Sequence, residues 1–386
     1  MKLQKPCYYL LLFLIIGTGC KVTSPSSTNK IPEKIPIDSV NIQVNSLEDD
    51  FTDINIFPLL PESVTIIGVG DMMLGTNFPE ERYLPPDSGK YMLKEVAETL
   101  RSADITFGNL EGVILNEGGD QKKCKNPNLC YLFRSPEYMA ARLKEAGFDL
   151  VSIANNHAGD FGDSGRINTS RVLDSIGINY AGSVLQPYTL FTRNNVKYGF
   201  AAFSPNKGTP SIGDLKTAIS TVKHLDSLCN IVIVSFHGGA EGKDYQHVTR
   251  ETEYFYGENR GNVYEFSHAL IEAGADIIFG HGPHVPRALE LFNNRLIAYS
   301  LGNFCTYGRF NLQGENAYAP ILKIIVDIDG SFLNGEIISA IQTGLGIPKL
   351  DSSHRAARTI KSLSEEDFQE AQIVIGDSGV ITYIEL

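Results

Sequence analysis

The chain has 386 residues, with 33 lysines and arginines against 45 aspartates and glutamates and a formal net charge of −12. Hydrophobic residues make up 42% and charged residues 20%, which is the usage of globular domains and excludes a wholly disordered or fibrous protein. The acidic balance argues against a nucleic-acid partner, because phosphate contacts require clustered lysine and arginine, and the sequence contains no such cluster.

The N-terminal segment has the pattern of an export signal. Two lysines precede an apolar run from Tyr8 to Ile16, which is too short to cross a bilayer at about 20 residues per crossing. Small residues then lead into Cys20, and this arrangement resembles a bacterial lipobox, although Gly17 stands where a lipobox usually has leucine. We therefore expect a signal peptide over residues 1–20 and an exported protein anchored in the cell envelope through lipidated Cys20. Lys21 favours the outer membrane or the cell surface over the inner membrane.

A flexible tether is predicted to follow the anchor. Residues 21–61 are rich in Ser, Pro, Asn and Asp and lack a sustained hydrophobic period, so they cannot bury enough apolar surface to offset the entropy lost on ordering. Residues 62–386 then form the globular domain. Within it, Cys124 and Cys130 bracket a short loop and could close a disulfide in an exported protein.

The predicted elements alternate between buried strands and helices. They are strands at 64–69, 104–107, 149–153, 231–236 and 275–279 and helices at 91–102 and 136–146. Such alternation is typical of βαβ units and a largely parallel sheet. From about 291 to 341 strands follow with little helix between them, which predicts a second, mixed or antiparallel sheet stacked on the first. A helix at 353–363 and short strands near 373 and 381 complete the domain.

Polar side chains follow the carboxyl ends of five predicted strands. They are Asp71, Asn109, Glu111, Asn156, His157, His237, Glu241, His281 and His284. In open α/β sheets, ligands bind at that edge. Oxygen and nitrogen ligands without thiolates suit a divalent metal such as Zn, Mn or Fe. A metal there would polarise an ester, amide or phosphoryl oxygen and lower the pKa of bound water.

Six motifs occur in a fixed order along the chain. They are GDMMLG at 70–75, GNLE at 108–111, ANNH at 154–157, HGGAE at 237–241, GHGPH at 280–284 and SLGNF at 300–304. The series resembles the CapA family of poly-γ-glutamate capsule biosynthesis proteins. The fold of that family is similar to that of the calcineurin-like metallophosphoesterases. The resemblance therefore implies an α/β fold with two mixed sheets in a four-layer αββα sandwich.

The resemblance also implies roles for single residues. It assigns metal binding to Asp71, Asn109, Asn156, His237, His281 and His284. The site departs from the phosphoesterase pattern because Met73 replaces a histidine and Asn109 replaces the aspartate that bridges two metals. Glu111 is a candidate for the missing carboxylate or for catalysis, and His157 or Glu241 for the general acid or base.

Other residues could contact the substrate. Arg134 and Arg287 could each clamp an anionic group with two parallel hydrogen bonds, although a surface or ion-pair role is an equal alternative. Asn303 is expected to shape the floor of the pocket.

Three functions remain open from the sequence. The first is an exported metal-dependent hydrolase or transferase acting on a γ-glutamyl amide or a phosphoester of an envelope polymer. The second is a non-catalytic capsule factor that binds polymer or subunits for capsule synthesis and export. The third is a surface phosphoesterase unrelated to capsule. The sequence has no Walker A motif for ATP, so any part in polymer synthesis is accessory.

Overall fold

The computed structural model describes residues 60–124 and 130–384. The predicted signal peptide with Cys20, and the predicted tether apart from residues 60 and 61, lie outside these described residues. None of the helices within the described ranges has both the length and the apolar character that crossing a lipid bilayer requires.

The first large sheet has nine strands built around β1, which spans Ser63–Met73. On one side β1 pairs in parallel with β2, and β5 and β6 continue the parallel order; on the other side β1 pairs antiparallel with β16. A further strand, β15, pairs with the carboxyl end of β1. The other strands are β2 (Ile105–Leu110), β5 (Leu150–Ser152), β6 (Asn179–Ala181), β15 (Asn303–Thr306), β16 (Ile321–Asp327), β17 (Phe332–Ile338), β20 (Ile373–Ile375) and β21 (Val380–Tyr383).

The second large sheet has six strands in the order β13-β14-β12-β9-β8-β7. The four central strands β14, β12, β9 and β8 are parallel, and the two outer strands pair antiparallel. The strands are β7 (Tyr188–Arg193), β8 (Val196–Phe203), β9 (Ile231–His237), β12 (Ile277–His281), β13 (Leu289–Phe292) and β14 (Arg295–Ala298).

A hydrophobic core lies between the two sheets. Phe107 of β2 stacks on Phe279 of β12 with ring centroids 5.0 Å apart, and it also packs against Phe200 of β8 at 5.4 Å. Gly68 in β1 permits this approach, because a Cβ atom there would lie only 2.3 Å from the Phe279 ring. Since side chains alternate along a strand, neighbouring residues of β1 face different layers: Ile66 joins this middle core and Ile67 the outer one.

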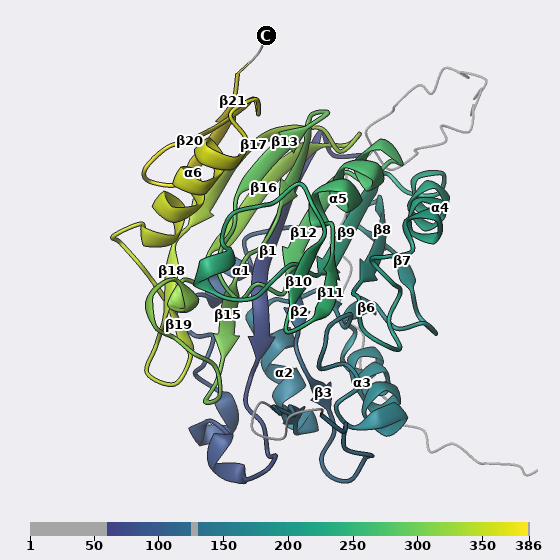
Figure 1. The fold of residues 1–386 in the computed structure, drawn as a ribbon, viewed down its shortest axis with the longest axis vertical. Coiled ribbons are helices and arrows are strands. Elements are labelled where there is room, and N and C mark those ends of the chain that lie inside the picture. The colour runs from purple at the N-terminus through teal and green to yellow at the C-terminus, as the bar shows by residue number, and fades with distance from the viewer. Residues whose placement is uncertain (1–59, 125–129, 385–386) are drawn as a thin grey trace, which may run out of the picture. The chain divides into compact units, whose positions relative to one another are not determined.

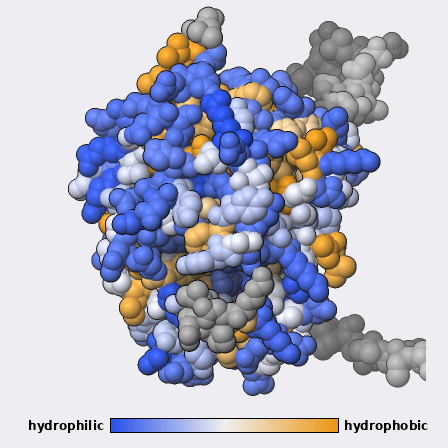
Figure 2. All heavy atoms as spheres, viewed as in Figure 1, coloured by the Kyte–Doolittle hydropathy of each residue, from blue (hydrophilic) through white to orange (hydrophobic). Residues whose placement is uncertain are grey.

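Helices cover the outer face of each sheet. On the first sheet they are α1 (Ala97–Leu100), α2 (Glu137–Ala146) and α3 (Gly162–Ile176), and on the second α4 (Leu215–Asp226) and α5 (Val263–Glu272). Helix α6 (Arg355–Asp367) packs against β13 and β17 and lies beside them in Figure 1. This order of layers confirms the predicted αββα sandwich. Figure 2 shows that the face seen in Figure 1 is largely hydrophilic, with hydrophobic residues in separate small groups.

Short elements occupy the connections. Three two-stranded sheets pair β3 (Val113–Ile114) with β4 (Arg134–Ser135), β10 (Glu253–Phe255) with β11 (Glu258–Gly261), and β18 (Ala340–Thr343) with β19 (Ile347–Leu350). Single 3₁₀ turns lie at Glu81–Tyr83, Pro86–Gly89, Lys243–Tyr245 and Gly314–Ala317. The predicted disulfide is confirmed: Cys124 and Cys130 are bonded, with their Cα atoms 5.7 Å apart.

Two sequence expectations about the fold were wrong. The helix predicted at 91–102 is reduced to α1, because turns occupy residues 90–96 although their apolar side chains are still buried. The C-terminal strands do not form a second sheet of their own. Instead β13 and β14 extend the sheet of β9 and β12, whereas β16 and β17 add to the sheet of β1. A strand that is apolar on both faces can join any sheet that covers both faces. The local hydrophobic pattern therefore does not reveal which sheet each C-terminal strand joins.

Arg287, for which the sequence left a substrate clamp and an ion pair as equal alternatives, forms a buried ion pair. Its side chain is fully buried, and its Nη1 and Nη2 donate to Glu253 Oε1 and Oε2 at 2.9 and 2.8 Å. Nη2 also donates to the carbonyl oxygen of Ala240 at 3.1 Å. The predicted bidentate carboxylate contact therefore exists, but its partner is the protein's own hairpin β10–β11. This pair fixes the hairpin to the strand-end loops.

We predict that Arg287→Met lowers the free energy of unfolding by about 3–5 kcal/mol, because it leaves the buried Glu253 carboxylate without a cation, with only the Ala240 N–H still donating to it. Urea unfolding of the purified variants measures this. Arg82→Met is the control, since the exposed Arg82–Glu80 pair contributes at most about 1 kcal/mol. The double variant Glu253→Met/Arg287→Met should recover much of the loss. If Arg287→Met and the control Arg82→Met had the same free energy of unfolding, the structural role of Arg287 would be contradicted.

Candidate functional site

The site forms where the carboxyl ends of β1, β2, β9 and β12 meet. Asp71 lies in β1 and faces Asn109 of β2 in register, and Asn109 Nδ2 donates to Asp71 Oδ1 at 2.8 Å. Glu111 follows β2, and His284 lies in the loop after β12. The second sheet thus contributes as much as the first, so the prediction of a single sheet edge was too simple.

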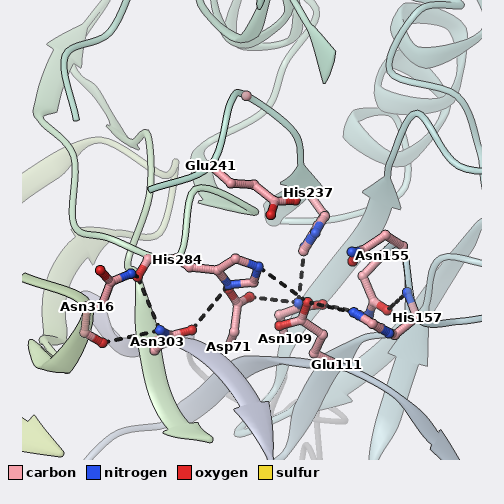
Figure 3. A network of polar contacts seen from close by, with 12 residues as sticks. Asp71, Asn109, Glu111, Asn155, His157, His237, Glu241, His284, Asn303 and Asn316 are labelled. Atoms are coloured by element: carbon pink, nitrogen blue, oxygen red, sulfur yellow. Dashed lines mark hydrogen bonds and ion pairs between the residues drawn. The ribbon is translucent and has the colours of Figure 1, made fainter. Parts of the chain in front are cut away.

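Asp71, Glu111 and His284 form the centre of the site (Figure 3). Asp71 Oδ2 lies 3.0 Å from His284 Nδ1, and Glu111 Oε1 lies 3.7 Å from His284 Nε2. One ligand atom from each residue falls within 4.8 Å of the other two. Both carboxylate groups are buried, and the oxygens of Glu111 have no hydrogen-bond partner within residues 60–124 and 130–384. We refer to these three residues as the acidic–imidazole cluster.

Burial and mutual charge shift the pKa values within the cluster. Burial raises the pKa of Glu111 well above its ordinary value; His284 opposes this shift and the nearby Asp71 carboxylate adds to it. Burial would also raise the pKa of Asp71, but the hydrogen bond and charge of His284 lower it below the ordinary range. Burial alone would lower the pKa of His284, yet Glu111 and Asp71 raise it to about 10. Without another cation, a protonated imidazole balances the buried carboxylates.

His284 is held in place by its backbone and by two asparagines. Its φ of 61° lies in the left-handed region, which is uncommon for residues other than glycine. Asn303 Oδ1 lies 3.2 Å from His284 Nδ1, and Asn303 Nδ2 donates to the His284 carbonyl oxygen at 3.2 Å. Asn316 Nδ2 donates to the same oxygen at 3.3 Å. Asn303 therefore lines the pocket as predicted, and its contacts orient His284.

His237 and Asn109 lie beside the cluster. His237 Nδ1 is 3.4 Å from Asn109 Nδ2, while His237 Nε2 is buried without a hydrogen-bond partner in the described part of the chain. Burial lowers the pKa of His237 well below its ordinary value, which favours the neutral ring. The Asn109 amide is occupied at both ends, since Asn155 Nδ2 donates to its Oδ1 at 3.2 Å. It links Asp71 to Asn155, and its assignment as a metal ligand stays a prediction.

His157 and Asp160 form a hydrogen-bonded pair at the edge of the cluster. His157 Nδ1 lies 2.7 Å from Asp160 Oδ2, and His157 Nε2 lies 3.9 Å from Glu111 Oε1. The His157 ring packs against Phe133 with centroids 4.3 Å apart, and the backbone N–H of Phe133 donates to Asp160 Oδ2 at 2.8 Å. Asp160 thereby fixes the orientation of His157, so that Nε2 is directed toward the cluster.

Sequence reasoning missed Asp160, although its spacing gave a signal. Asp160 follows His157 by three residues, and the chain turns tightly there, because the N–H of Asp160 donates to the carbonyl oxygen of His157 at 3.1 Å. A histidine with an acid three residues later is a pair that a local turn can bring together.

His281 is not brought into the cluster. Its Nε2 lies 3.1 Å from the carbonyl oxygen of Val69, and its Nδ1 lies 3.4 Å from Ser235 Oγ. Both ring nitrogens therefore contact protein atoms away from Asp71 and Glu111. The predicted pair of terminal histidine ligands is reduced to His284, because His281 is the last residue of β12 and follows the pleat of that strand into the core.

Asn155, and not the predicted ligand Asn156, is hydrogen-bonded to Asn109 beside the cluster. Asn155 Nδ2 also donates to the carbonyl oxygen of Leu110 at 2.9 Å, and Asn155 Oδ1 accepts from the His157 N–H at 3.1 Å. The Asn156 side chain lines the adjacent cleft, and its Oδ1 is buried without a hydrogen-bond partner among the described residues. Asn156 thus keeps a free oxygen, but no hydrogen bond joins it to the cluster.

A cleft of about 870 Å³ opens beside the cluster and is lined by His157, His284 and Glu241. Glu241 Oε1 lies 2.9 Å from Nη1 of the buried Arg260, and its side chain extends toward the cluster in Figure 3. Arg134, the other predicted clamp, does not line this cleft. Its Nε donates to Asn77 Oδ1 and its Nη1 to the Gly118 carbonyl oxygen, both at 2.8 Å, so its donors are engaged within the protein.

The residues present fit a divalent cation. The Glu111 oxygens and His237 Nε2 are buried groups without a described partner, which is costly unless a ligand satisfies them. Two carboxylates and one or two imidazoles, without thiolate, suit Zn, Mn or Fe. Asp71, Glu111 and His284 would hold the ion, with His237 as a fourth candidate.

Comparison with known proteins agrees with the motif series. The model of the family described as bacterial capsule synthesis protein PGA_cap matches residues 65–307. The chain is 27% identical to the capsule biosynthesis protein CapA of Bacillus anthracis over 264 residues, covering 63% of this chain and 60% of that protein. It is 27% identical to the PGA biosynthesis protein CapA of Bacillus subtilis over 252 residues, covering 61% of each.

The chain thus spans about 60% of the length of these two relatives. Among solved structures, it is similar to the calcineurin-like phosphoesterase YfkN from Bacillus subtilis, with a TM-score of 0.39, 12% identity, and coverage of 80% of this chain and 95% of that one. The family match covers well over half of the sequence, including every strand end that builds the cluster. The chain belongs to the bacterial capsule synthesis protein family PGA_cap.

Proposed function

We propose that this protein is an accessory factor of capsule or polyglutamate synthesis that acts as a metal-dependent hydrolase or transferase. Its substrate would be a γ-glutamyl amide or a phosphoester of a cell-envelope polymer. The observation that carries this proposal is the acidic–imidazole cluster, in which buried donor atoms converge at the base of an open cleft. The family match supports the link to capsule polymer.

The chain's own residues supply the remaining parts of the mechanism. A divalent ion bound at Asp71, Glu111 and His284 would polarise the scissile amide or phosphoryl oxygen and acidify a bound water. His157 is the general acid, because Asp160 holds its Nδ1 and leaves Nε2 to give a proton to the leaving group. Glu241 is the less suitable candidate, since its carboxylate is paired with Arg260.

One observation favours a non-catalytic alternative. Asn109 and His281, both expected to be ligands, are engaged with protein atoms, so the site offers donors for one ion and lacks the bridging carboxylate of a two-metal centre. A factor that binds polymer without cleaving it would need no more than this. Separate measurements of metal content and of turnover distinguish the metal-dependent enzyme from the non-catalytic factor. A surface phosphoesterase unrelated to capsule would cleave phosphoesters but not γ-glutamyl amides.

We predict that the purified protein retains about one divalent ion per chain and that Glu111→Gln weakens its affinity by about 100-fold, at the upper end of losses at metal sites. The variant removes one of the two carboxylate ligands. Elemental analysis after dialysis and calorimetric titration with Mn²⁺ or Zn²⁺ measure this. Glu258→Gln is the control, because Glu258 is an exposed carboxylate of the same cleft and should leave binding unchanged. Wild-type protein without bound metal would contradict the proposal.

We predict that His157→Ala lowers kcat by about 10²- to 10⁴-fold, the usual contribution of a general acid. Asp160→Asn should lower kcat by less and leave KM and metal content unchanged, because it disturbs only the orientation of His157. Assays on a γ-glutamyl oligomer and on a phosphodiester, with elemental analysis of each variant, test this. Unchanged kcat in both variants would assign the pair a structural role.

We also propose that the protein is exported and held in the cell envelope by lipid on Cys20, on the support of the N-terminal sequence pattern. The expected consequence is that Cys20→Ala moves the protein from the membrane fraction to the soluble fraction of the envelope. Immunoblots of fractionated cells measure this, with Cys229→Ala as the matched control. Retention of the Cys20 variant in the membrane would contradict lipid anchoring.

A further inference from the structure

The cleft gathers positive charge in an acidic protein. Five lysine or arginine side chains line it against two glutamates, although the whole chain has a net charge of −12. A concave surface with one prevailing sign of charge concentrates ligands of the opposite sign. Both substrate clamps expected from the sequence, Arg134 and Arg287, are engaged elsewhere, so the residue that would contact an anionic substrate has to be sought among these five.

Four of the five cations are poor candidates for a preformed anion contact. Three are already bonded to protein groups, and the fourth is an exposed lysine whose ammonium has no fixed direction. They are Lys122 (donor to the Asn156 carbonyl oxygen), Arg166 (paired with Asp163), Arg260 (paired with Glu241) and the exposed Lys207. Arg260 keeps Nη2 without a partner among the described residues, but its charge is already paired with Glu241.

Arg309 is both held in place and available. Its guanidinium carbon lies over two tyrosine rings, 5.0 Å from the centroid of Tyr83 and 4.9 Å from that of Tyr131. Such stacking fixes the plane of the group without using its hydrogen-bond donors. Only Nη1 has a hydrogen-bond partner in the described ranges, the Phe78 carbonyl oxygen at 3.4 Å. The remaining N–H groups are free to bind a ligand.

Covalent and hydrogen-bonded contacts restrain the neighbours of Arg309. Tyr131 directly follows Cys130, which is bonded to Cys124, so the disulfide restrains one of the two rings. The backbone before Arg309 is tied down by hydrogen bonds from the N–H groups of Tyr307 and Gly308 to the Met73 and Leu345 carbonyl oxygens, at 2.8 and 2.7 Å. The guanidinium is therefore preorganised, which reduces the entropy lost when a ligand binds.

The position of Arg309 adjoins the acidic–imidazole cluster. Its neighbour Phe310 packs against His284 with ring centroids 5.5 Å apart and stacks on Phe133 at 5.2 Å. Phe133 in turn packs against His157. The Phe133 and Phe310 rings thus connect His157 and His284 to the segment that carries Arg309. Arg309 also lines the cleft.

We propose that Arg309, held over the rings of Tyr83 and Tyr131, forms an oxyanion subsite that binds a carboxylate or phosphoryl group of the substrate while the scissile bond lies at the acidic–imidazole cluster. This inference rests on the proposed function, because it assigns a substrate contact in the same cleft. A planar guanidinium with free N–H groups matches the oxygens of either group. The subsite would select substrates that carry an anionic group next to the cleaved bond.

Calorimetric titration at low ionic strength tests the subsite with two probes, a γ-glutamyl dipeptide for the carboxylate and inorganic phosphate for the phosphoryl group. Arg309→Met should weaken binding of the recognised probe by about tenfold or more, because a charge-assisted pair is lost. Arg309→Lys should recover only part of it, since an ammonium lacks the planar fork. Arg82→Met is the matched control: Arg82 packs on the same Tyr83 ring at 5.0 Å but does not line the cleft.

Each outcome decides the inference. Weaker binding of one probe in Arg309→Met, with Arg82→Met unchanged, supports the subsite and identifies the group it takes; loss of both shows a general oxyanion site. Equal losses in the two variants, an unchanged Arg309 variant, or no binding of either probe to the wild type would overturn it. Metal content is measured on the same samples. If Arg309→Met weakens probe binding but the wild type holds no metal, the proposed function is rejected and the subsite is retained.

Discussion

Two carboxylates buried against one imidazole are the constraint on which this site depends. Asp71 and Glu111 lie on adjacent strands and are almost completely buried, so their charges are costly unless a cation or a proton compensates them. His284 provides that compensation, and its left-handed backbone is held by Asn303 and Asn316. The loop after β12 therefore has to close over the end of β1, and this closure leaves the Glu111 oxygens directed at a place where an ion fits.

The packing of the two sheets sets the distances within the site. The stack of Phe107 on Phe279 holds β2 against β12, and the lack of a Cβ atom at Gly68 lets the Phe279 ring approach β1. Asp71 and Glu111 come from the first sheet and His237 and His284 from the second, so the packing of the sheets sets the distances between these two pairs. The apolar core between the sheets thus sets the positions of the polar side chains at the strand ends.

The arginines of the chain divide by what surrounds them. Arg287 and Arg260 are buried and neutralise Glu253 and Glu241, so they stabilise the loops around the cleft. Arg309 is held by aromatic faces, which leave its hydrogen-bond donors free. An arginine paired with an acid of the same chain gives up much of its attraction for a ligand, whereas one stacked on tyrosine rings keeps it.

The sequence by itself indicated the disulfide and the residue types that reach the strand ends, because these follow from cysteine spacing and short-range hydrophobic pattern. Its motif order indicated the sandwich of two sheets through the resemblance to the CapA family. The sequence placed Asp71, Glu111 and His284 at the site, but it treated His281 as equal to His284 and left open whether Arg134 and Arg287 clamp a substrate or form surface or ion-pair contacts. Only the tertiary structure decided those points. The direction of a side chain and the partner it meets depend on strand register and on contacts between residues hundreds of positions apart, such as His281 with Val69.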